Sequence, residues 1–275
     1  MTTLPPGGSQ PSRPEPHRAR HIAESFGGDA ERYDRARPTY PDALVARIVA
    51  SMPGPEVLDV GCGTGIEARQ FQAAGATVLG IEPDERMADL ARARGLEVEV
   101  ATFETWEPGG RSFDALIAGQ SWHWVDPATG PAKAAEVLRP AGRLAVFGHV
   151  FDPPPEVAEA LAAGLRRVAP DAPVAGPGQA LELYQAMFAN FAERIRAVEG
   201  FTEPEQWSFD WKRRYTRDEW LDLLPTTGSL TRLPSDKLAE VLDGVGTAID
   251  GIGGHFTTTY TTLATTAART CSNQT

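Results

Sequence analysis

The hydrophobic positions between residues 55 and 150 form two alternating kinds of pattern. Short apolar runs bounded by glycine, proline or charged residues predict buried strands, and apolar residues at helical spacing between them predict packing helices. The predicted strands are Val57–Val60, Thr77–Ile81, Glu97–Ala101, Phe113–Ala118 and Leu144–Val150, and the predicted helices span 66–74, 84–94 and 131–138. Strands that alternate with helices at this spacing predict a right-handed, doubly wound parallel sheet of the α/β class.

The pattern changes after Phe151. Apolar residues at helical spacing around Leu161 and again around Phe188 predict two helices, with a loop rich in proline and glycine between them. The run from Trp207 to Lys212 alternates strictly between apolar and polar residues, which is typical of a half-buried strand. Thr216 and Glu219 have the spacing of a capping box at the start of a further helix. A threonine-rich stretch, 255–266, favours a last strand.

Composition narrows the class of protein without deciding its function. The 275 residues carry a net charge of −11, which argues against a nucleic-acid partner, because binding phosphates requires a basic surface. Two cysteines provide no disulfide framework, and no apolar run is long enough to span a membrane. These features predict a cytoplasmic protein of the size of an enzyme, with no nucleic acid and no membrane among its partners.

A glycine-rich turn follows the first strand. Gly61, Gly63 and Gly65 stand at alternate positions just before a helical pattern, with Asp59 ahead of them. Such a turn lets a ligand approach the backbone closely, and Glu82, at the end of the second strand, is placed to accept hydrogen bonds from two ribose hydroxyls. Two ligands fit this arrangement, a nicotinamide dinucleotide and S-adenosylmethionine. The dinucleotide fingerprint requires a glycine where Ile66 stands, which counts against it.

These stretches resemble the class I S-adenosylmethionine-dependent methyltransferases, and more narrowly the type 11 and trans-aconitate methyltransferase-like branch. The resemblance spans roughly residues 25–150. It is carried by the segments Leu58–Gly65, Gly80–Met87, Tyr33–Pro41, Gln120–Trp124 and Val137–Leu144, in which Ala141 replaces a glycine of the family. It implies a Rossmann-like, seven-stranded, mostly parallel sheet with an antiparallel last strand and a helical substrate cover.

The resemblance also implies a division of the chain. Residues 1–21 are expected to be a disordered tail, and 22–150 the cofactor-binding core with N-terminal cover helices. Residues 151–200 are expected to form the helical substrate cover, and 201–270 to complete the sheet with strands six and seven.

The same resemblance assigns cofactor-binding roles residue by residue. Asp59 is expected near the methionine end of S-adenosylmethionine, Glu82 at the ribose, and Met87 against the adenine. Where the family commonly has aspartate after the third strand, this chain has Thr102, so the hydroxyl of Thr102 and the backbone of Phe103 are the candidates for reading the adenine. The full cofactor set is Tyr33, Arg37, Asp59, Gly61, Gly63, Gly65, Glu82, Met87, Thr102, Phe103 and Gln120.

The implied reaction is in-line displacement of a methyl group by a small-molecule acceptor, through an oxygen or nitrogen atom, with a carboxylate or a natural-product hydroxyl among the candidates. His123 is the candidate general base, because it follows the fourth strand and histidine titrates near neutral pH. The alternative is that it only lines the pocket with Trp122 and Trp124, which together with His149 form the candidate substrate-binding set. No metal is expected, and the protein is expected to be a monomer or homodimer. Two other functions stay open, an NAD-dependent oxidoreductase and a relative that binds the cofactor without catalysis.

Overall fold

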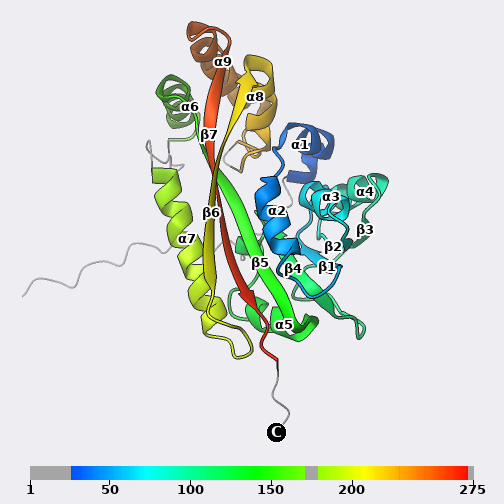
Figure 1. Ribbon diagram of the computed structural model, residues 1–275. Coiled ribbons are helices and arrows are strands. Elements are labelled where there is room, and N and C mark those ends of the chain that lie inside the picture. The colour runs from blue at the N-terminus through cyan, green and yellow to red at the C-terminus, as the bar shows by residue number, and fades with distance from the viewer. Residues whose placement is uncertain (1–25, 171–178, 229, 272–275) are drawn as a thin grey trace, which may run out of the picture.

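The strands form one mixed sheet in the computed structural model, which describes residues 26–170, 179–228 and 230–271 (Figure 1). Strands β1 to β5 run parallel, and β7 lies antiparallel to both β5 and β6. The described residues thus confirm the seven-stranded sheet with an antiparallel last strand, in the order β3-β2-β1-β4-β5-β7-β6. The bounds are β1 Glu56–Val60, β2 Thr77–Ile81, β3 Glu97–Glu99, β4 Phe113–Gly119, β5 Leu138–Asp152, β6 Glu205–Thr216 and β7 His255–Ala268. The tail predicted at 1–21 lies outside the described residues.

Helices cover both faces of the sheet and bury its apolar side chains. Helices α2, α3 and α4 pack on one face over residues such as Val57 and Ile117, and α5 and α7 pack on the other over Leu58 and Leu116. Full burial of each such side chain contributes about 1.5–3 kcal/mol. The helices are α1 Ala30–Ala36, α2 Asp42–Val49, α3 Ile66–Ala73, α4 Glu85–Ala93, α5 Gly130–Val137, α6 Pro155–Val168, α7 Gln179–Arg196, α8 Arg217–Leu223 and α9 Ser235–Gly251, with the short 3-10 helices Trp122–Trp124 and Leu224–Thr226.

Strands β5, β6 and β7 are longer than the parallel strands beside them and run past them at one end (Figure 1). Helices α6, α8 and α9 gather around this end and share a separate apolar cluster that includes Trp220 and Tyr260. The capping box predicted at Thr216 and Glu219 starts α8. Helix α6 belongs to this cluster, so only part of the predicted cover, residues 151–200, lies near the edge of the sheet where the parallel strands end.

Strand β5 begins earlier than predicted, at Leu138 instead of Leu144. It pairs first with Phe113, shifts register, and pairs again from Arg143 onward. Ala141, which replaces a family glycine, lies in the irregular stretch with φ +65°, a left-handed conformation that costs a non-glycine residue about 1–2 kcal/mol. Strand β3 ends at Glu99, two residues before its predicted end.

Helix α1 lies between α4 and α8 and is held by ion pairs on both sides. Asp34 pairs with Arg69 at 2.7 Å and with Arg94 at 3.6 Å. On the other side, Asp222 pairs with Arg32 and Arg35. These partly buried pairs orient α1 and the segment that follows it.

Candidate functional site

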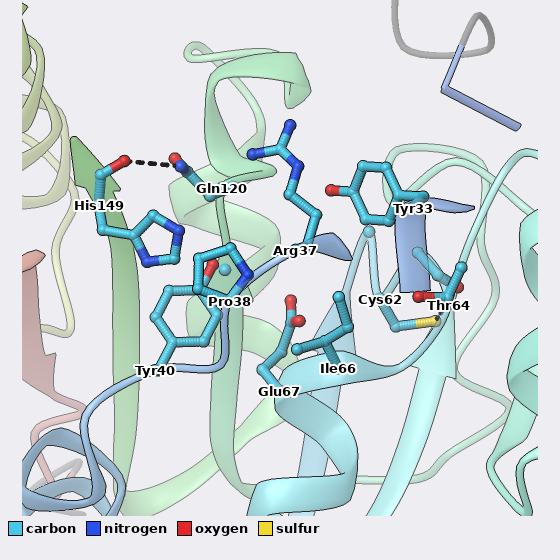
Figure 2. Close-up of a pocket in the computed structure, with 13 residues that line it drawn as sticks. Tyr33, Arg37, Pro38, Tyr40, Cys62, Thr64, Ile66, Glu67, Gln120 and His149 are labelled. Carbon is cyan, nitrogen blue, oxygen red and sulfur yellow. Dashed lines mark hydrogen bonds between the residues drawn. The ribbon is translucent and has the colours of Figure 1, made fainter. Parts of the chain in front are cut away.

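A cavity of about 630 Å³ opens at the carboxyl ends of the parallel strands. Its walls come from the glycine loop after β1, the ends of β2, β4 and β5, the first turns of α7, and Thr227, Gly228 and Arg232. The strand order reverses between β1 and β4, the place in open α/β sheets where ligands bind. A small pocket of about 30 Å³ adjoins this main cavity beside the glycine loop (Figure 2).

Most of the predicted site residues line the main cavity. They are Tyr33, Arg37, Gly61, Gly63, Glu82, Met87, Thr102, Phe103, Gln120, His123, Trp124 and His149. Three predicted residues line neither the main cavity nor the small pocket. Asp59 is fully buried behind the loop, Gly65 is the N-cap of α3, and Trp122 packs its ring against Phe103 in the core. Gly65 therefore forms the turn that starts α3, and Trp122 packs in the core.

Gly63 shows most directly that the loop is shaped for a ligand. Its φ of +54° lies in the left-handed region, and a Cβ built there would meet no described atom within 4 Å. At Gly61 the constraint is different, because a Cβ would lie 2.6 Å from the Cβ of Ser121. Gly61 thus allows close packing within the protein, whereas Gly63 leaves open space on the cavity side.

The Glu82 carboxylate lies at the end of β2, nearly buried in the cavity wall. The backbone amide of Gly63 donates to its Oε2 and that of Asp84 to its Oε1, both at 2.9 Å. Each oxygen keeps a further lone pair for a ligand hydroxyl. Burial raises the pKa of Glu82 to about 7, and the two amide hydrogen bonds act in the opposite direction.

Glu67, which the sequence analysis missed, lines the small pocket from the first turn of α3 (Figure 2). Burial raises the pKa of its carboxyl to about 8. Asp59 lies close enough for the two acids to interact, and burial together with Glu67 and Glu82 raises the pKa of Asp59 well above its usual value. Neither oxygen of Asp59 has a hydrogen-bond partner among the described residues. A cationic ligand group in the small pocket would stabilise the ionised form of these acids.

Arg37 and Tyr33 cover the glycine loop from the end of α1. The Arg37 guanidinium lies 4.9 Å from the centre of the Tyr33 ring and donates to the carbonyl of Thr226 at 2.6 Å. Its Nε is buried and finds no hydrogen-bond partner in the described part of the chain. The site thus presents an available cationic donor on Arg37 and a carboxylate on Glu67, which lie on separate parts of its wall (Figure 2). Such a pair of groups suits a ligand with both an acidic and a basic group.

The far wall of the main cavity is apolar. Met87 from α4 lies almost buried in it, beside Ile81 and Phe103. The loop that carries Phe103 is fixed by Lys133, whose ammonium donates to the carbonyls of Glu104 and Trp106. The hydroxyl of Thr102 shares a hydrogen bond of 2.9 Å with that of Thr105. This wall offers a flat apolar surface with a few polar groups at its edge, which suits a heterocyclic base.

The two histidines of the site differ in position. His123 lies on the 3-10 helix after β4 and lines the main cavity only, whereas His149, from β5, lines both the cavity and the small pocket. Burial lowers the pKa of His123 to about 4. Burial and the charge of Arg37 lower the pKa of His149 to about 3. Both imidazoles are therefore neutral at pH 7, which makes each a weak base in the ligand-free protein.

Gln120 connects three parts of the site. It adopts φ +57°, a left-handed conformation uncommon for glutamine, directly after β4. Its amide donates to the carbonyl of His149 at 2.9 Å and accepts from the hydroxyl of Tyr184 at 3.4 Å. Tyr184 belongs to α7 and is a further cavity residue that the sequence analysis did not identify. The strained backbone at Gln120 places its side-chain amide between β5 and α7.

Comparison with known proteins identifies this architecture. Residues 58–146 match the model of the methyltransferase domain family. The match supports a class I S-adenosylmethionine-dependent methyltransferase domain in this part of the chain. An uncharacterized methyltransferase of Mycobacterium tuberculosis is 36% identical over 136 residues, which cover 48% of this chain and 55% of that protein. A demethylmenaquinone methyltransferase of Tropheryma whipplei is 34% identical over 142 residues, covering 46% of this chain and 59% of that protein.

The likeness extends to solved structures. A candidate type II methyltransferase from Anaeromyxobacter dehalogenans superimposes with a TM-score of 0.56 at 25% identity, covering 84% of this chain and 97% of that one. The chain spans about half the length of the curated relatives it matches. The comparisons support the methyltransferase domain and do not single out the trans-aconitate branch.

The site fits S-adenosylmethionine, the cofactor of such a domain. The space in front of Gly63 would admit the ligand, and Glu82 would accept from the ribose hydroxyls. Arg37 and Glu67 would pair with the carboxylate and the ammonium of the methionine portion, and the wall around Met87 and Phe103 would hold the adenine. When bound, the cofactor supplies a methyl group activated by its positively charged sulfur.

The raised pKa values predict that cofactor binding depends on pH. The ligand favours ionised Glu67 and Glu82, whose pKa values in the free protein are about 8 and about 7. Binding must then release protons, and the affinity for S-adenosylhomocysteine should rise between about pH 6 and pH 8, by up to about tenfold per pH unit for each group. Calorimetry in two buffers of different ionisation enthalpy measures the protons released.

The raised pKa values of Glu67 and Glu82 also make the stability of the ligand-free protein depend on pH. Stability changes with pH in the opposite direction to the affinity. Folding raises these pKa values above the unfolded value of about 4.5, so the folded protein holds more protons through this range. Its stability should therefore fall as the pH rises from about 5 to about 8. Glu67→Gln should flatten both dependences, whereas Glu85→Gln, at an exposed position, should leave them unchanged. Equal affinity at pH 6 and pH 8 would contradict the assignment.

Proposed function

We propose that the protein transfers the methyl group of S-adenosylmethionine to a small molecule, at an oxygen or nitrogen atom. The observation that carries the proposal is the combination of the open space at Gly63 with the Glu82 carboxylate in one cavity. At about 630 Å³, this cavity is of the size that ordinarily holds small-molecule ligands. A carboxylate or a natural-product hydroxyl remains a candidate acceptor group. The relative from Tropheryma whipplei is named a demethylmenaquinone methyltransferase, and that substrate belongs to the relative.

The protein's contribution to this reaction is alignment and exclusion of water. Glu82 and the glycine loop would fix the cofactor, while the strand ends and α7 would hold the acceptor in line with the methyl group. Well-oriented reactions gain about 7–11 kcal/mol from such positioning. Because His123 and His149 are both neutral at pH 7, they can orient a nucleophile by hydrogen bonding without carrying charge.

The proposal also covers the partners of the protein, its compartment and its oligomeric state. The net charge of −11 supports a role without nucleic acid. We propose further that the protein acts in the cytoplasm, as a monomer or homodimer. Across the described ranges, no helix combines the length and the hydrophobicity needed to cross a bilayer.

The proposal is tested by turnover. Purified protein is incubated with S-adenosylmethionine labelled in its methyl group and with fractions of small-molecule extract, and label is followed into new products. We expect a labelled product that depends on the protein and is absent from the Glu82→Ala variant. Cofactor binding with no labelled product from any fraction would favour the non-catalytic alternative. Stabilisation by NAD in a melting scan, with none by S-adenosylhomocysteine, would favour an oxidoreductase instead.

A further inference from the structure

The main cavity and the small pocket meet along a boundary lined by few side chains. Tyr33, Arg37, Gln120 and His149 belong to the walls of both. On the proposed function, on which this inference rests, the methionine portion of the cofactor lies in the small pocket and its ribose lies at Glu82. The sulfur that carries the methyl group joins these two portions, so it belongs at the boundary. His123 lines the main cavity alone and is therefore farther from this place than His149.

His149 is directed toward the boundary and lacks a partner for one nitrogen. Its imidazole points toward Pro38 and Arg37 (Figure 2). The residue is 5% exposed, and its Nδ1 has no hydrogen-bond partner within the described residues. A buried N–H without a partner is rarer than a buried lone pair without one, so the proton belongs on Nε2. Nε2 then acts as a hydrogen-bond donor to a ligand.

Burial keeps this imidazole neutral, and the aromatic rings of Tyr40, Trp211 and Tyr260 contribute to that burial. Trp211 and Tyr260 stack on each other at 4.2 Å, and both lie nearly perpendicular to His149, with ring centres 5.9 and 5.3 Å away. Because the two stacked rings are almost equally distant, their edges face the imidazole. Aromatic edges carry positive partial charge, which disfavours an imidazolium ion. The guanidinium of Arg37 acts in the same direction.

Two hydrogen bonds fix the position of His149 relative to α7. Gln120 donates to the backbone carbonyl of His149 and accepts from Tyr184 of α7. Gly148, the neighbour of His149, leaves room for this amide, since a Cβ there would lie 2.5 Å from Oε1 of Gln120. Gln120 is thus a positioning residue that links the start of α7 to the placement of His149.

The charges on the acceptor side favour an anion. Arg232 lines the main cavity, is exposed, and forms no ion pair with a carboxylate in the described part of the chain. Arg37 is committed to the carboxylate of the methionine portion, so Arg232 is the cation that remains for the acceptor. Of the cavity's acids, Glu82 is committed to the ribose, and Glu104 accepts from the amide of Asp126. The groups left to meet the acceptor are therefore mainly donors.

We infer that His149, and not His123, contacts the acceptor at the point of methyl transfer, and that the acceptor presents an ionised oxygen to it. This oxygen forms a bond to the methyl carbon while the bond between that carbon and sulfur breaks, and the electron pair of the broken bond stays on the sulfur. The oxygen arrives ionised, so no proton has to leave and no base is required. The weak basicity of both histidines is then no obstacle.

The test uses benzoate as an anionic probe and benzamide as its neutral isostere, with the full chain saturated with S-adenosylhomocysteine. The protein is labelled with ¹⁵N at histidine, and the spectrum of His149→Phe identifies the His149 signals by difference. In the wild type we expect His149 to show the Nε2–H tautomer, to stay neutral between about pH 5 and pH 9, and to shift with benzoate. His149→Phe keeps the ring packing against Trp211 and Tyr260 and should weaken benzoate binding about tenfold, as for one hydrogen bond to a charged group.

The matched variants decide between the two histidines. His123→Phe and the exposed-site control His255→Phe should change benzoate affinity less than about twofold, within the usual effect of a substitution away from the contact. Loss of benzoate binding in His123→Phe, equal binding of benzoate and benzamide, binding of neither, or an unchanged affinity in His149→Phe would each overturn the inference. Failure of S-adenosylhomocysteine to bind the wild type would instead overturn the proposed function.

Discussion

Replacing Glu82 by alanine is expected to weaken S-adenosylhomocysteine binding by about tenfold to a thousandfold. The carboxylate would lose one or two hydrogen bonds from ribose hydroxyls, each of about 1–3 kcal/mol for a charged acceptor, and 1.4 kcal/mol corresponds to a factor of ten. The variant also leaves the amides of Gly63 and Asp84 without their acceptor, so the loop itself becomes less fixed. Isothermal titration at pH 8, where the wild-type carboxyl is ionised, measures the change.

A matched control separates this effect from a general loss of acidic charge. Glu85 lies three residues further on, in the first turn of α4, and is exposed. Glu85→Ala should bind S-adenosylhomocysteine as the wild type does. If Glu82→Ala also kept its affinity while remaining folded by circular dichroism, Glu82 would have no part in holding the ribose.

Replacing Gly63 by alanine is expected to abolish measurable cofactor binding while the protein stays folded. The added methyl group would meet no protein atom, because nothing lies within 4 Å of that position in the described structure. It would instead fill the space that the ligand is expected to occupy. The left-handed φ of +54° adds about 1 kcal/mol of strain, which a folded domain tolerates.

Gly109 provides the control for that strain. It has a similar φ of +59°, is equally open around its Cβ position, and lies in an exposed loop outside the cavity. Gly63→Ala and Gly109→Ala should therefore lose similar stability in urea unfolding, and only the first should lose S-adenosylhomocysteine binding. Equal binding by both variants would show that the open face of Gly63 is not a ligand contact.

The sequence was sufficient for the parts of the site that depend on local geometry. A glycine turn between a buried strand and a helix, followed by an acid at the end of the next parallel strand, brings Gly63 and Glu82 together because both strands end at the same edge. The apolar runs also predicted the parallel strands, since a strand buried on both faces needs a continuous apolar sequence.

Other parts of the site depend on packing between distant segments, which no local pattern records. Trp122 points into the core because of the 3-10 turn that follows β4, and Tyr184 reaches the cavity only because α7 crosses the end of β5. The position of Glu67 in the sequence could have identified it as a site residue. It stands four residues before Phe71, so it shares the buried face of α3, and an acid on a buried face next to a ligand loop indicates a functional group.

The substrate cover predicted at 151–200 stays a prediction, and its described residues lie in two places. Of this stretch, Phe151, Ala180 and Tyr184 line the main cavity, while α6 packs into the cluster at the far end of the long strands. Thr227, Gly228 and Arg232 line the cavity as well. The amphipathic pattern of α6 shows that one face is buried and does not show against what, so the sequence alone could not choose between the two places.

The central claim is that this cavity holds S-adenosylmethionine, and calorimetric titration of the wild-type protein with S-adenosylhomocysteine tests it most directly. If the cavity holds the cofactor, the titration will show one site per chain, affinity that increases from pH 6 to pH 8, and release of protons on binding. An absence of binding at high micromolar ligand, with protein shown to be folded, would contradict it.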